Sequence, residues 1–158
     1  MKMLIVLGEG GHSTELLNLI KLMGTQYEYC YIVSKEDNLS IDRITHTGQI
    51  YKLDRPRGKY TSKMMAIWLT LKAFIDALFI LLRVRPMAIL STGPAIAVPV
   101  SIVGKLLGAW IIFVETGSRI ATLSLTGRIM YRWADLYFVQ WPQLQQKLPK
   151  AIYAGRLV

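Results

Sequence analysis

Cysteine is almost absent from this chain of 158 residues, which contains only Cys30. A lone cysteine cannot form an intrachain disulfide, so a disulfide-stapled secreted scaffold is excluded. Cys30 lies in an apolar run from residue 29 to 33, a pattern typical of a buried strand. Hydrophobic residues make up 53% of the chain, which excludes intrinsic disorder. We therefore expect one folded domain in a reducing, cytoplasmic setting.

Acidic residues are also scarce, with 10 Asp and Glu against 19 Lys and Arg, and the net charge is +9. Much of this excess is local, because residues 52–85 hold eight basic and two acidic side chains. A basic band beside an apolar one suits an anionic membrane surface. Nucleic-acid binding would require a recognisable basic module, which this sequence lacks, so we expect no nucleic-acid partner.

No uninterrupted apolar run is long enough to cross a bilayer, which takes about 20 residues. Residues 64–82 come near, but Lys72 and Asp76 interrupt them. A central charge costs about 2.5–3.5 kcal/mol on insertion scales, which disfavours spanning. We expect a membrane-associating helix within residues 60–85 that packs one side on the sheet and offers the other to lipid; an ordinary core helix is the alternative. The expected membrane-facing residues are Lys59, Lys63, Trp68, Phe74, Phe79, Arg83 and Arg85.

Apolar runs bounded by turn residues alternate with longer segments of helical periodicity along the whole chain. The expected strands are 3–7, 28–33, 49–53, 87–90, 110–114, 136–139 and 151–153. The expected helices are one capped by Ser13 and closed by Gly24, then 61–82, 95–107, 123–133 and 143–147. Such alternation predicts an α/β fold, a single Rossmann-like domain over residues 1–158 with an open parallel sheet.

Three turns follow expected strands and would meet at the carboxyl edge of the sheet, where ligands bind in such folds. They are residues 8–13 (GEGGHS), 91–94 (STGP) and 114–119 (VETGSR). Glycines before a helix let an anion approach free N–H groups, although they also serve close packing. A dinucleotide fingerprint is not met, because its third glycine would fall on Ser13. The turns therefore predict a phosphate-binding cleft.

Two side chains in these turns could carry chemistry. His12 is a candidate general base, with helix capping as the alternative. Glu115 could assist or replace His12, or it could pair with Arg119 across one helical turn.

Five segments of the sequence resemble one family of glycosyltransferase subunits. They are the three turns and, most specifically, residues 135–144 (DLYFVQWPQL) and 153–158 (YAGRLV). The family is the membrane-anchor, acceptor-binding subunit of the two-protein UDP-N-acetylglucosamine transferase that adds the second sugar to a lipid diphosphate, with its bacterial exopolysaccharide counterparts. The chain is also similar, more distantly, to the N-terminal half of MurG.

The resemblance implies the N-terminal, acceptor half of a split GT-B glycosyltransferase, on the cytoplasmic face of the membrane. It implies a small donor-binding partner subunit that mainly holds the UDP-sugar, a polyprenyl-diphosphate-linked sugar as acceptor, inactivity alone, and no metal or tightly bound cofactor. His12 and Glu115 become the candidate catalytic residues. The expected diphosphate-binding residues are Gly8, Gly10, Gly11, Ser13, Gly93, Ser118 and Arg119. A non-catalytic membrane adaptor that recruits the donor subunit is the alternative.

Overall fold

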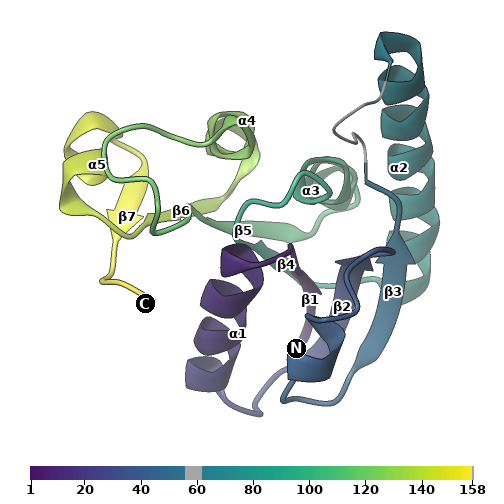
Figure 1. Cartoon of the computed structure of the whole chain (residues 1–158). Helices are drawn as coiled ribbons and strands as arrows, with labels where there is room; N and C mark the ends of the chain where they lie inside the picture. The colour runs from purple at the N-terminus through teal and green to yellow at the C-terminus, as the bar shows by residue number, and fades with distance from the viewer. Residues whose placement is uncertain (56–61, 158) are drawn as a thin grey trace.

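Strands and helices alternate along the chain in the computed structural model, which describes residues 1–55 and 62–157 except the Lys63 side chain (Figure 1). The strands are β1 (Lys2–Val6), β2 (Glu28–Ser34), β3 (Gln49–Leu53), β4 (Ala88–Ser91), β5 (Trp110–Val114), β6 (Leu136–Val139) and β7 (Ala151–Tyr153). The helices are α1 (Gly11–Met23), the 3-10 turn η1 (Ile41–Arg43), α2 (Lys63–Val84), α3 (Ala97–Leu106), α4 (Leu125–Trp133) and α5 (Pro142–Lys147). The predicted α/β fold is confirmed.

All seven strands run parallel in the order β3-β2-β1-β4-β5-β6-β7. The strands are apolar on both faces because helices cover each face of a parallel sheet. Helices α2, α3 and α4 lie on one face of the sheet and α1 on the other (Figure 1). Leu4 and Val6 belong to the core on the first face, whereas Met3 and Ile5 belong to the core under α1. The strand order reverses between β1 and β4: after β1 the chain continues toward β2 and β3, and after β4 it continues toward β5, β6 and β7.

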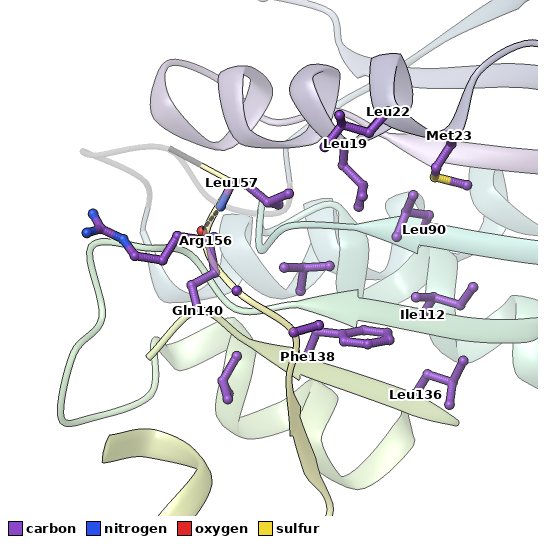
Figure 2. A pocket seen from close by; sticks show the side chains of 14 residues that line it. Leu19, Leu22, Met23, Leu90, Ile112, Leu136, Phe138, Gln140, Arg156 and Leu157 are labelled. Carbon is purple, nitrogen blue, oxygen red and sulfur yellow. Dashed lines mark hydrogen bonds between the residues drawn. The ribbon is translucent and has the colours of Figure 1, made fainter. Parts of the chain in front are cut away.

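The face that carries α1 is only partly covered. Among the described α-helices, only α1 contributes to the apolar core on that face. Beside it, side chains of β4, β5 and β6 form the floor of an apolar groove of about 400 Å³ (Figure 2). Leu19, Leu22 and Met23 of α1 form one wall and residues 154–157 the other. Leu22 is 79% exposed at the rim of this groove.

Helix α2 has two contrasting sides. Its inner side buries Ala73, Ala77, Leu81 and Val84 against the rest of the domain. Its outer side exposes large apolar side chains over its full length, so it is not an ordinary buried core helix. The exposed residues include Met64, Ile67, Trp68, Leu71, Ile75, Phe79 and Leu82.

The expected membrane-facing residues do not all lie on this outer side. Trp68, Phe79, Arg83 and Arg85 are exposed. Phe74 is only partly exposed, because this ring packs against the core that also holds the buried Ala73 and Ala77. Lys59 and the side chain of Lys63 lie outside the described part of the chain.

Lys72 and Asp76, the charged residues that interrupt the apolar sequence of α2, lie on the side of the helix that faces the end of β3. Lys72 forms ion pairs with Asp54, just after β3, and with Asp76 one turn further along the helix. Lys35 also donates to Asp54, at 2.9 Å. Hydrogen bonds from Lys72 and Lys35 lower the pKa of the Asp54 carboxyl. The outer apolar side of α2 is therefore continuous although its sequence is interrupted.

Replacing Asp54 with Asn is expected to destabilise the fold in a pH-dependent way. A carboxyl whose pKa is lowered by folding stabilises the folded state above its unfolded pKa of about 3.9, and this contribution is lost as the pH falls through the lower folded value. Urea unfolding from pH 7 to pH 2.5 should show the largest difference from wild type near neutral pH and a vanishing one in acid. Asp42→Asn, at an exposed carboxylate of η1, is the control. A difference that stays constant with pH would contradict the ion-pair role.

Candidate functional site

A cleft of about 280 Å³ opens at the carboxyl ends of β1 and β4, where the strand order reverses. This is where ligands bind in open α/β sheets. Two of the three predicted turns meet in it, the one after β1 and the one after β4. The lining residues are Leu7, Gly8, Glu9, His12, Ser34, Arg55, Gly93, Pro94, Ala95 and Ile96.

The glycines of the first turn allow a close approach and an open helix end. A Cβ atom on Gly8 would lie 2.8 Å from Cβ of Pro94, so only glycine lets the two turns touch. Helix α1 begins at Gly11, and its N-cap Gly10 has φ 63° and no capping side chain. The first N–H groups of α1 are thus available to an anion, which the positive end of the helix dipole favours.

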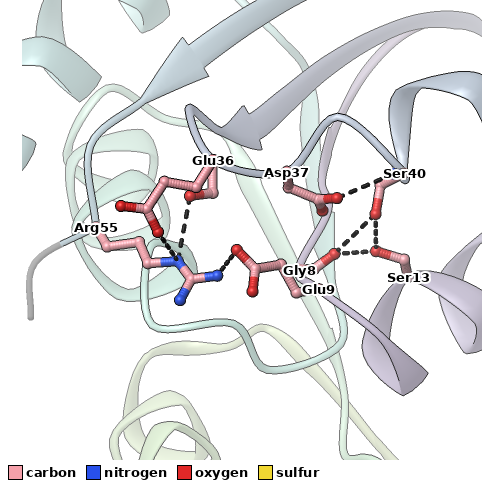
Figure 3. A network of polar contacts seen from close by, with 8 residues as sticks. Gly8, Glu9, Ser13, Glu36, Asp37, Ser40 and Arg55 are labelled. Carbon is pink, nitrogen blue, oxygen red and sulfur yellow. Dashed lines mark hydrogen bonds and ion pairs between the residues drawn. The ribbon is translucent and has the colours of Figure 1, made fainter. Parts of the chain in front are cut away.

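Ser13 does not cap α1 as predicted, because the helix begins two residues earlier. Its side chain is fully buried and its hydroxyl donates to the carbonyl of Gly8, to which the Ser40 hydroxyl also donates at 3.2 Å (Figure 3). The two bonds fix the peptide that joins Gly8 to Glu9. Since the trans peptide is planar, the N–H of Glu9 points away from these serines. Ser13 therefore shapes the turn from inside.

His12 is the imidazole of the cleft. Its ring lies against the second turn, with Cε1 3.5 Å from the position of a Cβ on Gly93. The Thr92 hydroxyl donates to the backbone carbonyl of His12 at 2.8 Å and joins the two turns. Nδ1 of His12 is buried and has no hydrogen-bond partner among the described residues. The ring still lines the cleft, so a ligand there would meet the imidazole at an edge other than this enclosed nitrogen.

Glu115 lies in the interior, away from the cleft lining. The side chain is fully buried, and its oxygens accept from the Tyr137 hydroxyl at 3.0 Å and from the N–H groups of Thr116 and Ser124. Burial, followed by the Glu115 charge, raises the pKa of Tyr137. Residues 115–119 are not helical, and the described contacts of Glu115 do not include the alternative partner Arg119. Glu115 holds the start of α4 beside β6.

The third turn is joined to α1 rather than to the cleft. Glu15, 5% exposed, accepts from the Thr116 hydroxyl at 3.0 Å and from the Gly117 N–H at 2.9 Å. Ser118 and Arg119 follow on the exposed part of this turn and do not line the cleft. Glu15 was missed by sequence reasoning, although a carboxylate next to the apolar Leu16 and Leu17 of an amphipathic helix was a signal.

Sequence reasoning also missed the charged residues of the cleft, Glu9 and Arg55. Arg55 follows β3 by two residues, so its strand delivers it to the same edge of the sheet. Its guanidinium forms an ion pair with Glu9 and donates from Nε to the Ser34 hydroxyl at 3.2 Å (Figure 3). Glu36 Oε2 lies 3.8 Å from Nε. The end of β3 was the available signal, because the carboxyl ends of parallel strands share one edge.

The two segments that carry the resemblance most specifically lie together in space. The Trp141 indole donates to the Gly117 carbonyl at 2.6 Å, and the Arg156 guanidinium lies 4.3 Å above the Trp141 ring. The Leu157 N–H donates to the side chain of Gln140 at 2.8 Å. These contacts fix the third turn and the wall of the apolar groove.

Comparison with known proteins relates the chain to one family. A family model described as "Oligosaccharide biosynthesis protein Alg14 like" matches residues 3–157. The UDP-N-acetylglucosamine transferase subunit ALG14 of Mus musculus is 30% identical over 181 residues, which cover 100% of this chain and 83% of that protein. The subunit of the same name from Candida albicans is 32% identical, with coverage of 98% and 77%.

Solved structures with the same fold are more distant in sequence. Acinetobacter baumannii MurG has a TM-score of 0.75 at 17% identity, over 99% of this chain and 45% of that one. A UDP-GlcNAc 2-epimerase from Methanocaldococcus jannaschii has a TM-score of 0.75 at 15% identity, over 99% and 46%. The chain thus spans about half the length of these structures and shares their fold. On the family match over residues 3–157 and the similarity to these subunits, the chain belongs to the Alg14-like family of oligosaccharide biosynthesis proteins.

Proposed function

We propose that this chain is the acceptor-binding, membrane-associated subunit of a heteromeric glycosyltransferase. The enzyme moves a sugar from a UDP-sugar to a polyprenyl-diphosphate-linked saccharide, with inversion, at the cytoplasmic face of the membrane. The observation that carries the proposal is the cleft between the first two turns, which joins an uncapped helix end to the imidazole of His12. Relatives named as UDP-N-acetylglucosamine transferase subunits support the reaction class.

The proposed chemistry divides between the backbone and His12. The diphosphate of the acceptor lies on the N–H groups of Gly10, Gly11 and Gly93. The His12 imidazole removes the proton of the attacking sugar hydroxyl, whose oxygen bonds to the anomeric carbon of the donor while UDP leaves with the electron pair of the broken bond. Glu115 takes no part, since its oxygens are engaged in the interior.

A second, small subunit supplies the site for the UDP-sugar. The chain matches about half the length of the solved structures that share its fold, and small-molecule sites lie preferentially at the interface between two domains. The apolar groove beside α1 supports an interface with this partner, because its floor and the exposed Leu22 form an apolar surface on the face opposite α2. Exposed apolar patches of this kind mark interaction sites.

The outer side of α2 supports the membrane contact. Helix α2 has the length and composition of a membrane span, but its inner side packs on the domain and 17% of the apolar stretch is buried there. The helix therefore lies in the membrane interface, with Trp68 and Phe79 toward the lipid and Arg83 and Arg85 at the level of the headgroups.

A membrane adaptor without catalytic residues is the second candidate. It is favoured by the burial of Glu115, which leaves His12 as the candidate base among the residues named from the sequence. In this case the partner performs all the chemistry and the chain only recruits it to the membrane.

The substitution His12→Ala decides between the two functions. In the reconstituted pair we expect the rate of sugar transfer to fall by about 10²–10⁴, the usual contribution of a general base. Glu115→Gln is the matched control: it should lower the free energy of unfolding by about 1–3 kcal/mol, because it disturbs a buried hydrogen-bonded carboxylate, and leave the rate per folded molecule within a few-fold of wild type. Near-normal turnover by His12→Ala would favour the adaptor.

The apolar groove beside α1 and the outer side of α2 should be separable by mutation, because the first binds the partner and the second binds the membrane. Leu22→Asp is expected to abolish co-purification with the donor subunit and to leave flotation with anionic vesicles intact. Trp68→Asp combined with Phe79→Asp is expected to do the reverse, since charges on the lipid side oppose insertion. Leu39→Asp is the control for both assays, because this apolar side chain is 80% exposed but belongs to neither surface. Loss of both properties in either variant would contradict the assignment of two surfaces.

A further inference from the structure

Arg55 is the permanent positive charge of the cleft among the described residues that line it. Its side chain is 36% exposed and reaches the cleft from the strand end after β3, next to the glycine turn. The other cations described nearby are engaged elsewhere, because Lys35 and Lys72 both pair with Asp54. Arg119, the cation expected from the sequence, lies on the exposed third turn.

The positive charge of Arg55 is masked by the protein itself. Glu9, the residue between Gly8 and Gly10, forms an ion pair with the guanidinium, and Glu36 lies 3.8 Å from Nε (Figure 3). Ser34 accepts from the same Nε at 3.2 Å. A carboxylate thus stands in the cleft where an anionic ligand would have to meet the guanidinium.

This ion pair can be replaced. The side chains of Arg55 and Glu9 are 36% and 43% exposed, and exposed pairs of this kind contribute little to stability. A diphosphate carries more negative charge than one carboxylate and offers oxygens in the geometry that a guanidinium binds in bidentate fashion. The N–H groups at the start of α1 can also donate to the diphosphate. The Glu9 side chain, which pairs with Arg55, has no described hydrogen bond to these groups.

We propose that Arg55 binds the diphosphate of the lipid acceptor and that Glu9 is an internal counter-ion which the diphosphate displaces. The proposal rests on the proposed function, because it names a ligand of the same cleft. It assigns the phosphate-binding cation to the end of β3 in place of Arg119. It also gives the cleft a preference for ligands with more than one negative charge, since a weakly charged ligand would not displace Glu9.

Binding of farnesyl diphosphate to the full chain, followed by isothermal titration calorimetry at low salt, tests the proposal, with farnesol as the uncharged probe. We expect Arg55→Gln to weaken binding of the diphosphate at least about tenfold, Arg55→Lys to weaken it less, and Arg119→Gln to leave it unchanged. Glu9→Gln should strengthen binding several-fold, and this gain should shrink at 0.5 M salt because the competing charge is screened. Thermal unfolding checks that each variant folds.

The outcomes separate the inference from the proposed function. If wild type binds neither probe, or binds both equally, the cleft is not a diphosphate site and the proposed function fails. If wild type prefers the diphosphate but folded Arg55→Gln and Arg55→Lys bind it as tightly, the role of Arg55 is overturned. If Glu9→Gln weakens binding, Glu9 supports the ligand and its role as a counter-ion is overturned.

Discussion

The reversal of strand order between β1 and β4 is the constraint on which the site depends. Because every strand of the sheet runs in the same direction, each one delivers its following turn to a single edge. At the reversal the chain departs to opposite faces of the sheet, and the space between the departing turns is the cleft. Gly8 then allows these turns to touch. The hydroxyl of Thr92, in the turn after β4, donates to the carbonyl of His12 and so holds the start of α1 against that turn.

Carboxylates serve two different purposes around this cleft. Glu15 and Glu115 are buried and accept hydrogen bonds that fix the third turn and the start of α4. Gly127 shows how closely Glu115 is enclosed, since a Cβ there would overlap its carboxylate. Glu9 and Glu36 remain exposed to solvent next to Arg55. Glu15 and Glu115 thus stabilise the fold, whereas Glu9 and Glu36 keep their charges accessible at the cleft.

The order of strands and helices could be predicted from the sequence, because apolar runs, helical periodicity and turn residues mark each element along the whole chain. The bounds of β3, β5, β6 and β7 agree with those expected, and the ends of the other expected elements differ by at most two residues, except the start of α1. The start of α1 was misplaced because Ser13 has the chemistry of a cap, whereas its hydroxyl is needed inside the turn.

Side-chain direction could not be read from the sequence in the same way. Nothing in the residues next to Glu115 shows that Ser124, nine residues on, and Tyr137, 22 residues on, enclose its carboxylate. Phe74 is apolar whether it faces lipid or core, and only the packing of α2 decides. Arg55 belongs to the site because strand order brings the end of β3 near the glycine turn, a long-range property that no local motif records.

In the proposed function, this chain supplies the acceptor half of an enzyme and needs a second subunit to complete it. The most direct measurement is transfer of labelled sugar from UDP-N-acetylglucosamine to polyprenyl-diphosphate-linked N-acetylglucosamine in vesicles, by the purified chain, by its partner, and by both. We predict that product forms at a substantial rate only when both are present. Product formed by this chain alone as fast as by the pair would contradict the claim.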